Sequence, residues 1–257
     1  MVFADAILAR RLEAAEAANA RGCCAADPAS VLEIAGGCAI FVGADSPLTQ
    51  AVGLGLNGPV DDTRIRELEA FFRSRGAPVA IDLCPHADPA FVEALAARGY
   101  RPAEFNNVLV RRLEGLEIAF TPRVRRALAS EADVWSHTVG HGFFEQPELT
   151  SGEMDVGRAI FAMPGALCYL SATESGQLAG GGALAIYDGL ATLFADSTVP
   201  ASRRTGLHRE LIAARLNEAL ARGCTLATAS TLPGSGSQRN YERLGFQVAY
   251  TKVTVRG

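Results

Sequence analysis

The sequence has 257 residues, which is long enough for one large domain or two small ones. Hydrophobic residues make up 49% and charged residues 20%, a composition that excludes an intrinsically disordered chain. The formal net charge of −4 disfavours a nucleic-acid-binding protein, because such proteins usually carry a basic surplus, although a local basic patch could still hold a small anion.

The first half of the chain predicts a helix and then strands that alternate with helices. Residues 2–20 are expected to be helical, because an apolar stripe repeats at helical spacing and the charged residues lie off it. The stripe is Phe3, Ile7, Leu8, Leu12 and Ala15, and the residues off it are Arg10, Arg11, Glu13 and Glu16. The further elements are a hairpin over 31–42 that turns at Gly36-Gly37, a strand at 50–56, a helix from Asp61-Asp62 to Gly76, a strand at 79–83, a helix from Asp88-Pro89 to Gly99 and a strand at 105–110.

The second half predicts a similar series. Its elements are a strand at 116–120, a helix at 130–144, strands at 166–172 and 177–186 around the turn Glu174-Ser175-Gly176, a strand at 189–196, a helix at 204–222, a strand at 225–229, a helix at 237–244 and a strand at 246–255.

The two series suggest that a whole domain has been duplicated. The order of a strand pair, strand, helix, strand, helix and strand occurs twice, and Ala97-Arg98-Gly99-Tyr100 resembles Arg243-Leu244-Gly245-Phe246. A period of roughly 140 residues is too long for a solenoid, whose repeats span about 20–50 residues. We therefore expect an α/β protein with mixed sheets and two domains, 1–114 and 115–257, divided at Glu114-Gly115.

The segment from Val199 to His208 lies between a predicted strand and a predicted helix. The first N–H groups of a helix have no partner within it, and the helix dipole adds positive potential, so such a turn is a natural anion site. Gly206 leaves room for a phosphate to approach, and Arg203 and Arg204 could add charge-assisted hydrogen bonds. Taken alone, the segment could equally be a solvated loop with two exposed arginines.

A second informative segment runs from Ser235 to Phe246. It leads from a polar loop into a short helix that ends at Gly245 before an apolar strand. Asn240 and Tyr241 could face a cleft shared with the arginine–glycine turn, although the segment alone favours an ordinary capped amphipathic helix.

Together, in this order, the two segments resemble the GNAT family of N-acetyltransferases. That family carries a Q/R-x-x-G-x-G/A turn, which 203–208 fits except at its last position, and often a proline three residues earlier, as at Pro200. It also carries a C-terminal Y-x-x-x-G-F/Y motif, which Tyr241 to Phe246 fits. The resemblance covers 116–255.

The resemblance implies that acetyl-CoA is the co-substrate, with no metal. The pyrophosphate would lie on backbone N–H groups over 204–208, and the pantetheine arm would run beside the strand that ends at 196–199. A free N–H near Thr198 would stabilise the oxyanion, Tyr241 would protonate the leaving thiolate, and Asn240 could contact the pantetheine. The implied donor-binding residues are Thr198, Val199, Arg203, Arg204, Thr205, Gly206, Leu207, His208 and Asn240, and the implied catalytic residues are Tyr241 and Thr198.

Three features depart from the family pattern. His208 replaces a glycine or alanine and could shield the pyrophosphate or contact the 3′-phosphate. Gly234 stands where an asparagine is common, seven residues before Tyr241. No general base can be transferred, because the strand before the turn offers only Asp196.

Other side chains leave alternatives open. His137 and His141 share a helix face at a spacing that could hold a metal, but no third ligand is evident nearby, so with Glu145 they either line a cleft or belong to an ordinary surface helix. The aromatic residues Trp135, Phe143 and Phe144 could be core or could line an apolar acceptor site. Gly180-Gly181-Gly182 precedes strand-like residues, so a bulged or closely packed strand is favoured over a nucleotide loop.

The first half lacks the phosphate-binding pattern. Its corresponding segment is 57–62, where no arginine precedes Gly58 and two acidic residues, Asp61 and Asp62, begin the helix. These carboxylates would repel a pyrophosphate, so this half is interpreted as a degenerate copy of the fold that helps to close the acceptor cleft.

The sequence also allows a prediction of the cellular compartment. The charge-free stretches 159–173 and 177–187 are shorter than the roughly 18 residues that a membrane span needs. The charged residues that follow residue 9 do not fit a signal peptide, so we expect a cytoplasmic protein whose six cysteines are free and mostly buried.

The sequence therefore predicts an N-acetyltransferase that moves an acetyl group directly from acetyl-CoA to a small-molecule or peptide amine. The alternatives are a longer acyl donor or a non-amine acceptor, and a CoA-binding sensor without turnover. No nucleic-acid or membrane partner is expected, and the oligomeric state and the acceptor are left open.

Overall fold

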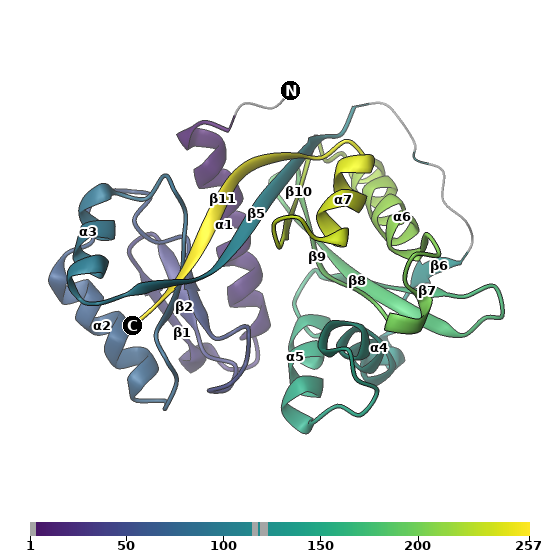
Figure 1. Cartoon of the computed structure of the whole chain (residues 1–257), viewed down its shortest axis with the longest axis horizontal. Helices are drawn as coiled ribbons and strands as arrows, with labels where there is room; N and C mark the ends of the chain where they lie inside the picture. Colours follow the sequence, from purple (N-terminus) through teal and green to yellow (C-terminus); the bar gives the residue numbers. More distant parts are fainter. Residues whose placement is uncertain (1–3, 115–117, 119–122) are drawn as a thin grey trace. The chain divides into compact units, whose positions relative to one another are not determined.

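A computed structural model of the chain describes residues 4–114, 118 and 123–257 (Figure 1). These residues form two compact units: one of residues up to 108 together with 249–257, and one of 109–248. The two long strands β5 (Arg101–Arg112) and β11 (Gln247–Arg256) each contribute residues to both units. The predicted strand at 116–120 lies outside the described residues, apart from Ile118.

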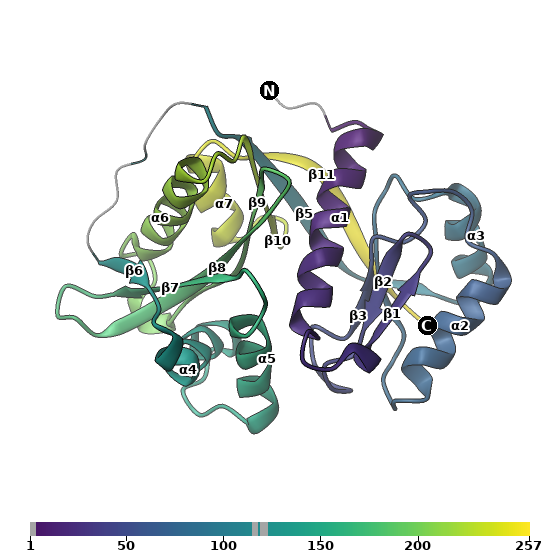
Figure 2. The same ribbon diagram turned by 180° about the vertical axis from the view of Figure 1, so that it is seen from behind.

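The unit that begins the chain is a mixed sheet with helices on both faces (Figures 1 and 2). Its elements are α1 (Ala6–Cys23), a 3₁₀ turn (Pro28–Ser30), β1 (Val31–Ile34), β2 (Gly37–Ile40), β3 (Gln50–Val52), α2 (Asp62–Arg73), β4 (Ala80–Leu83) and α3 (Pro89–Ala97). Strands β1, β2 and β3 pair antiparallel, β3 and β4 pair parallel, and the end of β11 pairs antiparallel with β4. The hairpin and both predicted helix starts are confirmed, with Asp61 and Asp88 as N-caps.

One prediction in this unit was wrong. Glu13 was expected on the solvated side of α1, but it is 1% exposed, whereas Ile7 of the expected apolar stripe is 75% exposed. The reason is long-range: Lys252 of β11 is fully buried against α1 and forms ion pairs with Glu13, Glu16 and Asp82. Helical periodicity could not reveal a cation supplied from the end of the chain.

The second unit contains a longer mixed sheet. Its elements are the end of β5, β6 (Val124–Arg126), a 3₁₀ turn (Ala129–Glu131), α4 (Ala132–Phe144), α5 (Ser151–Phe161), β7 (Leu167–Ala172), β8 (Leu178–Tyr187), β9 (Leu190–Thr198), a 3₁₀ turn (Pro200–Ser202), α6 (Leu207–Ala221), β10 (Leu226–Thr231), α7 (Gly236–Arg243) and the start of β11. The strands run in the order β5-β10-β9-β8-β7-β6. β9 and β10 pair parallel, and β6 to β9 pair antiparallel.

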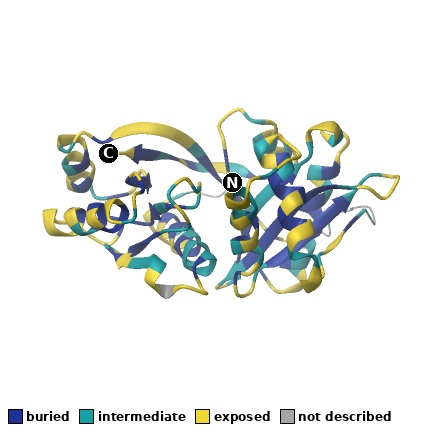
Figure 3. Cartoon of the chain, turned by 90° about the horizontal axis from the view of Figure 1, so that it is seen from below, coloured by how far each residue is buried: buried dark blue, intermediate teal, exposed yellow. Residues whose placement is uncertain are grey.

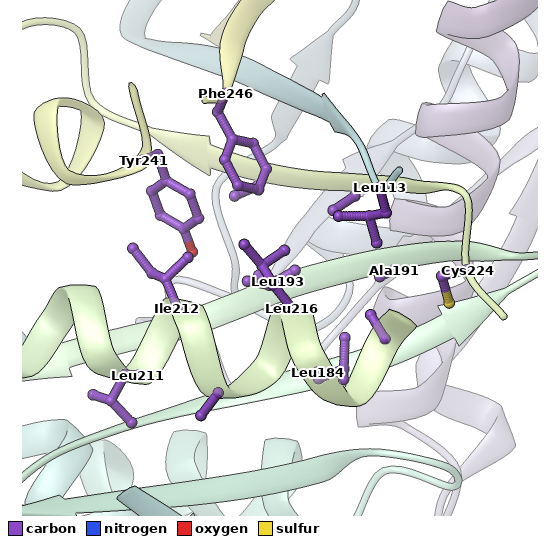
Figure 4. Close-up of a cluster of buried hydrophobic side chains, with 14 of the residues drawn as sticks. Leu113, Leu184, Ala191, Leu193, Leu211, Ile212, Leu216, Cys224, Tyr241 and Phe246 are labelled. Atoms are coloured by element: carbon purple, nitrogen blue, oxygen red, sulfur yellow. The ribbon is translucent and has the colours of Figure 1, made fainter. Parts of the chain in front are cut away.

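Packing in this unit follows the apolar stripe predicted for α6. Leu211, Ile212 and Leu216 are fully buried against the sheet, and Tyr241 and Phe246 join the same cluster from α7 and its end (Figure 4). Helix α4 covers the opposite face of β8 and β9, and α5 packs against α4 (Figure 1). Coloured by burial, the strands are largely buried and the outer helix faces exposed (Figure 3).

The mixed α/β class is confirmed, and so is the repeated order of elements. In both halves three antiparallel strands are followed by a helix and a parallel strand, β4 in one case and β10 in the other. The last strand of each half lies in the other unit's sheet: β11 beside β4, and the end of β5 beside β10. The expected domain boundary between residues 114 and 115 stays a prediction.

Two further facts concern the whole described chain. Among the described residues, none of the helices has the length and apolarity needed to cross a bilayer. The six cysteines are free; five are buried and Cys23 is half-buried. Burial raises the pKa of the Cys84 and Cys168 thiols to about 12, so neither is a reactive thiolate at neutral pH.

Candidate active site

The turn between β9 and α6 has the geometry of an anion site. Gly206 precedes the helix with φ of +91°, a left-handed conformation that favours glycine, and Arg204 also has a positive φ of +66°. The hydroxyl of Thr205 donates to Ser202 O at 2.7 Å, which fixes the turn. The first N–H groups of α6 have no intrahelical partner and carry the positive end of the helix dipole.

This turn forms one wall of a cavity of about 680 Å³, whose other walls are the end of α4, the end of β9 and α7. Seven of the sequence-predicted site residues line it: Thr198, Arg203, Arg204, Gly206, Leu207, His208 and Asn240. Val199, Thr205 and Tyr241 are not among the lining residues. The N–H of Val199 donates to Ala179 O at 2.9 Å, so it is already occupied.

The cavity wall is strongly cationic. It contains five arginines, Arg203, Arg204, Arg209, Arg239 and Arg243, and a single carboxylate, Asp196. The Arg203 guanidinium is bound to Glu145 at 2.6 Å and to Gly142 O at 2.9 Å, which ties α4 to the turn. Within the described chain the other four have no carboxylate within ion-pair distance, so their charge is available to a ligand.

Strand β9 departs from its neighbours where it reaches the cavity. Its parallel pairing with β10 runs from Leu190 to Leu193 and stops there, although β9 continues to Thr198. On the other side Phe194 pairs with Ala183 and Ser197 with Gly181, so two residues oppose Gly182 in a β-bulge. Ala195, in the bulge, has φ of +54°. Strand β9 therefore splays away from β10 beyond Leu193.

The glycine run on β8 makes room for this bulge. A Cβ on Gly182 would lie 2.6 Å from Asp196 Oδ1 and 2.7 Å from Arg215 Nη1, and one on Gly180 would lie 2.8 Å from Ser197 O. These separations are too short for any other residue, so the interpretation of the run as a closely packed, bulged strand is confirmed.

Asp196 is the centre of a buried polar network. Its Oδ2 accepts a hydrogen bond from the Tyr241 hydroxyl, and its Oδ1 faces the fully buried guanidinium of Arg215. Arg215 also donates to Ala183 O at 2.9 Å and to Leu211 O at 3.0 Å, which joins α6 to β8 at the bulge. On the cavity side, His208 Nε2 lies 3.6 Å from Asp196 Oδ2.

The charges in this network set the protonation of its members. Burial would raise the pKa of Asp196, but the positive charge of Arg215 and the nearby His208 hold it below its ordinary value. Burial and the negative charge of Asp196 together raise the pKa of Tyr241 well above its ordinary value. Asp196 is therefore an ionised acceptor and Tyr241 a protonated donor, and neither is suited to take a proton from an amine.

Within the described chain, four buried polar atoms around the cavity lack a hydrogen-bond partner. They are Ser197 Oγ, Thr198 Oγ1, His208 Nε2 and Asp196 Oδ1, all on residues that line the cavity, and Asp196 Oδ1 faces the Arg215 guanidinium. Buried polar groups are normally paired, so their presence together indicates a site for a polar ligand. A pantetheine arm, with two amides, and a phosphorylated end suit these atoms and the arginines.

The remaining candidates lie elsewhere. The His137 ring contacts Pro147 O at 2.9 Å, and neither it nor His141 lines the cavity. Among the described residues no group of His, Cys, Asp or Glu is arranged to hold a metal ion. Trp135 is core, since it is fully buried and its indole donates to Tyr169 O, whereas Phe143 lines the cavity.

Arg215 and the arginines of α7 were not among the site residues predicted from the sequence. Arg215 follows Leu211 by four residues on the apolar face of α6, and a charge there is a sign of a buried partner. Arg239 and Arg243 also share a helix face at a spacing of four. Both signals were present in the sequence.

The corresponding segment of the first half has no such site. The Asp61 side chain accepts from Arg64 N at 2.8 Å, and Asp62 forms ion pairs with Arg66 and Arg98. Carboxylates thus occupy the start of α2, where an anion would otherwise bind.

Comparisons with known proteins agree with this fold. The protein-family model described as "Acetyltransferase (GNAT) family" matches residues 133–246. Among solved structures, a GCN5-related N-acetyltransferase from Kribbella flavida is similar over 95% of both chains, with a TM-score of 0.65 and 19% identity. A GCN5-related N-acetyltransferase from Sphaerobacter thermophilus is similar over 76% of this chain and 66% of that chain, with a TM-score of 0.57 and 16% identity. A tandem GNAT protein from the clavulanic acid biosynthesis pathway is similar over 81% of this chain and 73% of that chain, with a TM-score of 0.58 and 16% identity. A search of curated proteins found no match.

The fold and the cavity define an α/β protein with a cationic site at a strand-to-helix turn. Residues 133–246 match the family model of the GNAT acetyltransferases, and members of that family use acetyl-CoA as the acyl donor. The family match falls in the unit that holds the cavity.

Proposed function

We propose that this protein transfers an acetyl group from acetyl-CoA to a small-molecule or peptide amine by direct attack in a ternary complex. One observation carries the proposal: within the segment that matches the GNAT model, an arginine-rich cavity opens where β9 leaves β10, at the start of α6. The buried hydroxyls of Ser197 and Thr198 there have no hydrogen-bond partner within the described chain. These features match a donor with phosphates at one end and amides along its arm.

The residues that would hold the donor come from the turn and from α7. The N–H groups over 204–208 would bind the pyrophosphate, and Arg204, Arg209, Arg239 and Arg243 supply positive charge around it. Ser197 and Thr198 would hydrogen-bond the pantetheine amides, since their buried hydroxyls have no other partner. The donor supplies an activated thioester carbonyl.

The chain's own contribution to chemistry is to stabilise charge. A backbone N–H near Thr198, at the end of the splayed strand, would stabilise the oxyanion that forms when the amine attacks. Tyr241 would protonate the leaving sulfur, and its hydroxyl is held in place by Asp196. The unit that begins the chain would act as a degenerate copy without a donor site.

Replacing Gly206 with valine tests the donor site. The valine side chain would be strained at φ of +91° and would crowd the first N–H groups of α6, so CoA affinity should fall about tenfold or more, which is at least about 1.4 kcal/mol. Gly176→Val is the matched control: this glycine has φ of +84° and open space, but lies in the β7–β8 turn.

Isothermal calorimetry with CoA gives the readout, and thiol release from acetyl-CoA with a panel of amines gives turnover. We expect Gly176→Val to bind CoA like the wild type. Unchanged CoA affinity in Gly206→Val would contradict the donor site. CoA binding without thiol release for any amine would instead support the sensor.

A further inference from the structure

His208 stands between the cavity and the Asp196–Tyr241 hydrogen bond. Its side chain is 15% exposed and lines the cavity. On one side of the ring, Nδ1 lies 3.0 Å from Asn240 Nδ2. On the other side, Nε2 lies 3.6 Å from Asp196 Oδ2, the same oxygen that accepts from Tyr241. Its ring also meets that of Tyr241 edge-on, with centroids 5.8 Å apart.

The tautomer of the ring follows from these contacts. With Asn240 Nδ2 donating to Nδ1, the proton of a neutral imidazole resides on Nε2, directed at Asp196. When the ring takes up a second proton at Nδ1, the Asn240 amide can turn and offer its oxygen instead. Asn240 therefore supports both protonation states of His208 without a change in the orientation of the imidazole ring.

We propose that His208 is a proton-relay residue that returns a proton to Tyr241 through the carboxylate of Asp196. The inference rests on the proposed function, because it concerns the proton that Tyr241 gives to the leaving sulfur. His208 acts through two other side chains and is a positioning residue in this sense, not one that contacts the reacting atoms.

In the proposed transfer, the amine nitrogen bonds to the thioester carbon and the carbon–sulfur bond breaks with its electron pair on sulfur. The sulfur then takes the Tyr241 hydroxyl proton. The His208 imidazolium closes its present 3.6 Å separation from Asp196 Oδ2 to hydrogen-bond distance, and its Nε2 proton passes to that oxygen and from there to the Tyr241 phenolate. The imidazole regains a proton from solvent through the cavity, and solvent also accepts the proton released by the amine.

No other group facing Tyr241 from its packed elements can play this part. Arg215 of α6 and the cavity arginines keep their protons at any physiological pH. Asp196 of β9 is ionised and carries no proton of its own. Burial and the negative charge of Asp196 raise the pKa of Tyr241, so a phenolate beside that carboxylate is disfavoured. A nearby proton source would therefore speed the return of the phenolate to the phenol. Imidazole is the side chain that gains and loses a proton near neutral pH.

The test is the pH profile of kcat in His208→Gln. Glutamine can fill the space and accept from Asn240, but it cannot change its protonation. At saturating substrates, kcat reports groups of the bound complex. We expect the variant to be about tenfold slower than wild type near pH 6 and about equal near pH 9. His137→Gln, an exposed histidine outside the cavity, should keep the wild-type profile.

A double-mutant cycle separates a relay from packing. If His208 acts through Tyr241, His208→Gln should change kcat by less than about twofold in the Tyr241→Phe background. Three results would each overturn the relay while leaving the proposed transfer standing. They are a loss of kcat in His208→Gln that is the same at every pH, an equal loss of kcat in the wild-type and Tyr241→Phe backgrounds, and a tenfold weaker CoA affinity. CoA binding without turnover in the wild type would overturn the proposed transfer, and the relay with it.

Discussion

Tyr241 is held by two kinds of contact that a single substitution can separate. Its ring packs against Phe246 in the core cluster (Figure 4) and meets the His208 ring edge-on, while its hydroxyl donates to Asp196. The ring contacts give shape to the site, whereas the hydroxyl carries the proton that the proposed chemistry uses. Removing only the Tyr241 hydroxyl therefore distinguishes a residue that acts as a general acid from one that only packs against the donor site.

Tyr241→Phe should lower kcat by about 10²–10⁴, the usual contribution of a positioned acid, with little change in CoA affinity. It should also lower stability by about 1–3 kcal/mol, because Asp196 Oδ2 loses its donor while still buried. Stopped-flow thiol release, where chemistry limits turnover, and thermal unfolding measure the two effects. Tyr169→Phe is the matched control, since the buried Tyr169 hydroxyl has no hydrogen-bond partner among the described residues and its loss should leave kcat unchanged. Wild-type kcat in Tyr241→Phe would remove Tyr241 from the mechanism.

At the scale of elements, the bulge between β8 and β9 connects the glycine run to the site. The bulge turns Asp196 toward Arg215 and leaves the end of β9 free of β10. Because Arg215 bonds β8 and its own helix, the position of α6 is fixed relative to the bulge.

Gly182→Ala should disrupt this arrangement. The added methyl group would overlap Asp196 and Arg215, which are buried and cannot retreat to solvent, so we expect a loss of about 1–3 kcal/mol in stability. CoA affinity should fall as well, because the end of β9 shifts. Gly152→Ala, in open space on α5, should keep or increase stability. Equal melting temperatures for Gly182→Ala and wild type would show that the bulge tolerates a side chain.

Local patterns predicted most of the elements, and the failures have identifiable causes. The hairpin at Gly36-Gly37, the caps at Asp61 and Asp88 and the apolar stripe of α6 are encoded within a few residues. Helix α5 was missed because its glycines obscure the pattern, although Thr150 and Glu153 form a capping box. Gly157 is required because α5 approaches α4, where a Cβ would lie 2.6 Å from the Ser136 side chain.

Long-range pairing could not be predicted in the same way. The motifs located the turn and α7, but the partners of Asp196 come from α6 and α7, and the role of Lys252 depends on strand β11 reaching the first unit. Such contacts depend on topology, which sequence periodicity does not contain.

At the scale of the whole molecule, the two ends of the chain meet in a buried charge cluster. Lys252 of β11 faces three carboxylates, Glu13, Glu16 and Asp82, and the Tyr250 hydroxyl donates to Glu13 at 2.7 Å. Burial raises the pKa of Glu16 to about 7, and the negative charges of Glu13 and Asp82 oppose its ionisation further. One cation among three carboxylates thus favours a retained proton.

This cluster predicts a pH dependence of stability. Between about pH 4.5 and about pH 7 the folded chain holds a proton on Glu16 that the unfolded chain has released, so stability falls as pH rises, by up to about 1.4 kcal/mol per pH unit. Glu16→Gln should flatten this fall and gain stability relative to wild type at pH 8. Urea unfolding at several pH values measures it, with Glu67→Gln, an exposed carboxylate on α2, as control. Parallel pH profiles for Glu16→Gln and wild type would contradict the assignment.

The asymmetry of the two units leads to the last prediction, which is one CoA per chain. In the second unit the start of α6 is uncapped by any side chain and faces arginines, whereas the start of α2 is capped by Asp61 and carries a second carboxylate, Asp62. A pyrophosphate placed there would meet two like charges and N–H groups that are already engaged. Calorimetric titration should therefore give a stoichiometry of one, and Gly206→Val should weaken that single site. Two equivalents per chain, or one full equivalent bound with wild-type affinity in Gly206→Val, would contradict a single donor site at the start of α6.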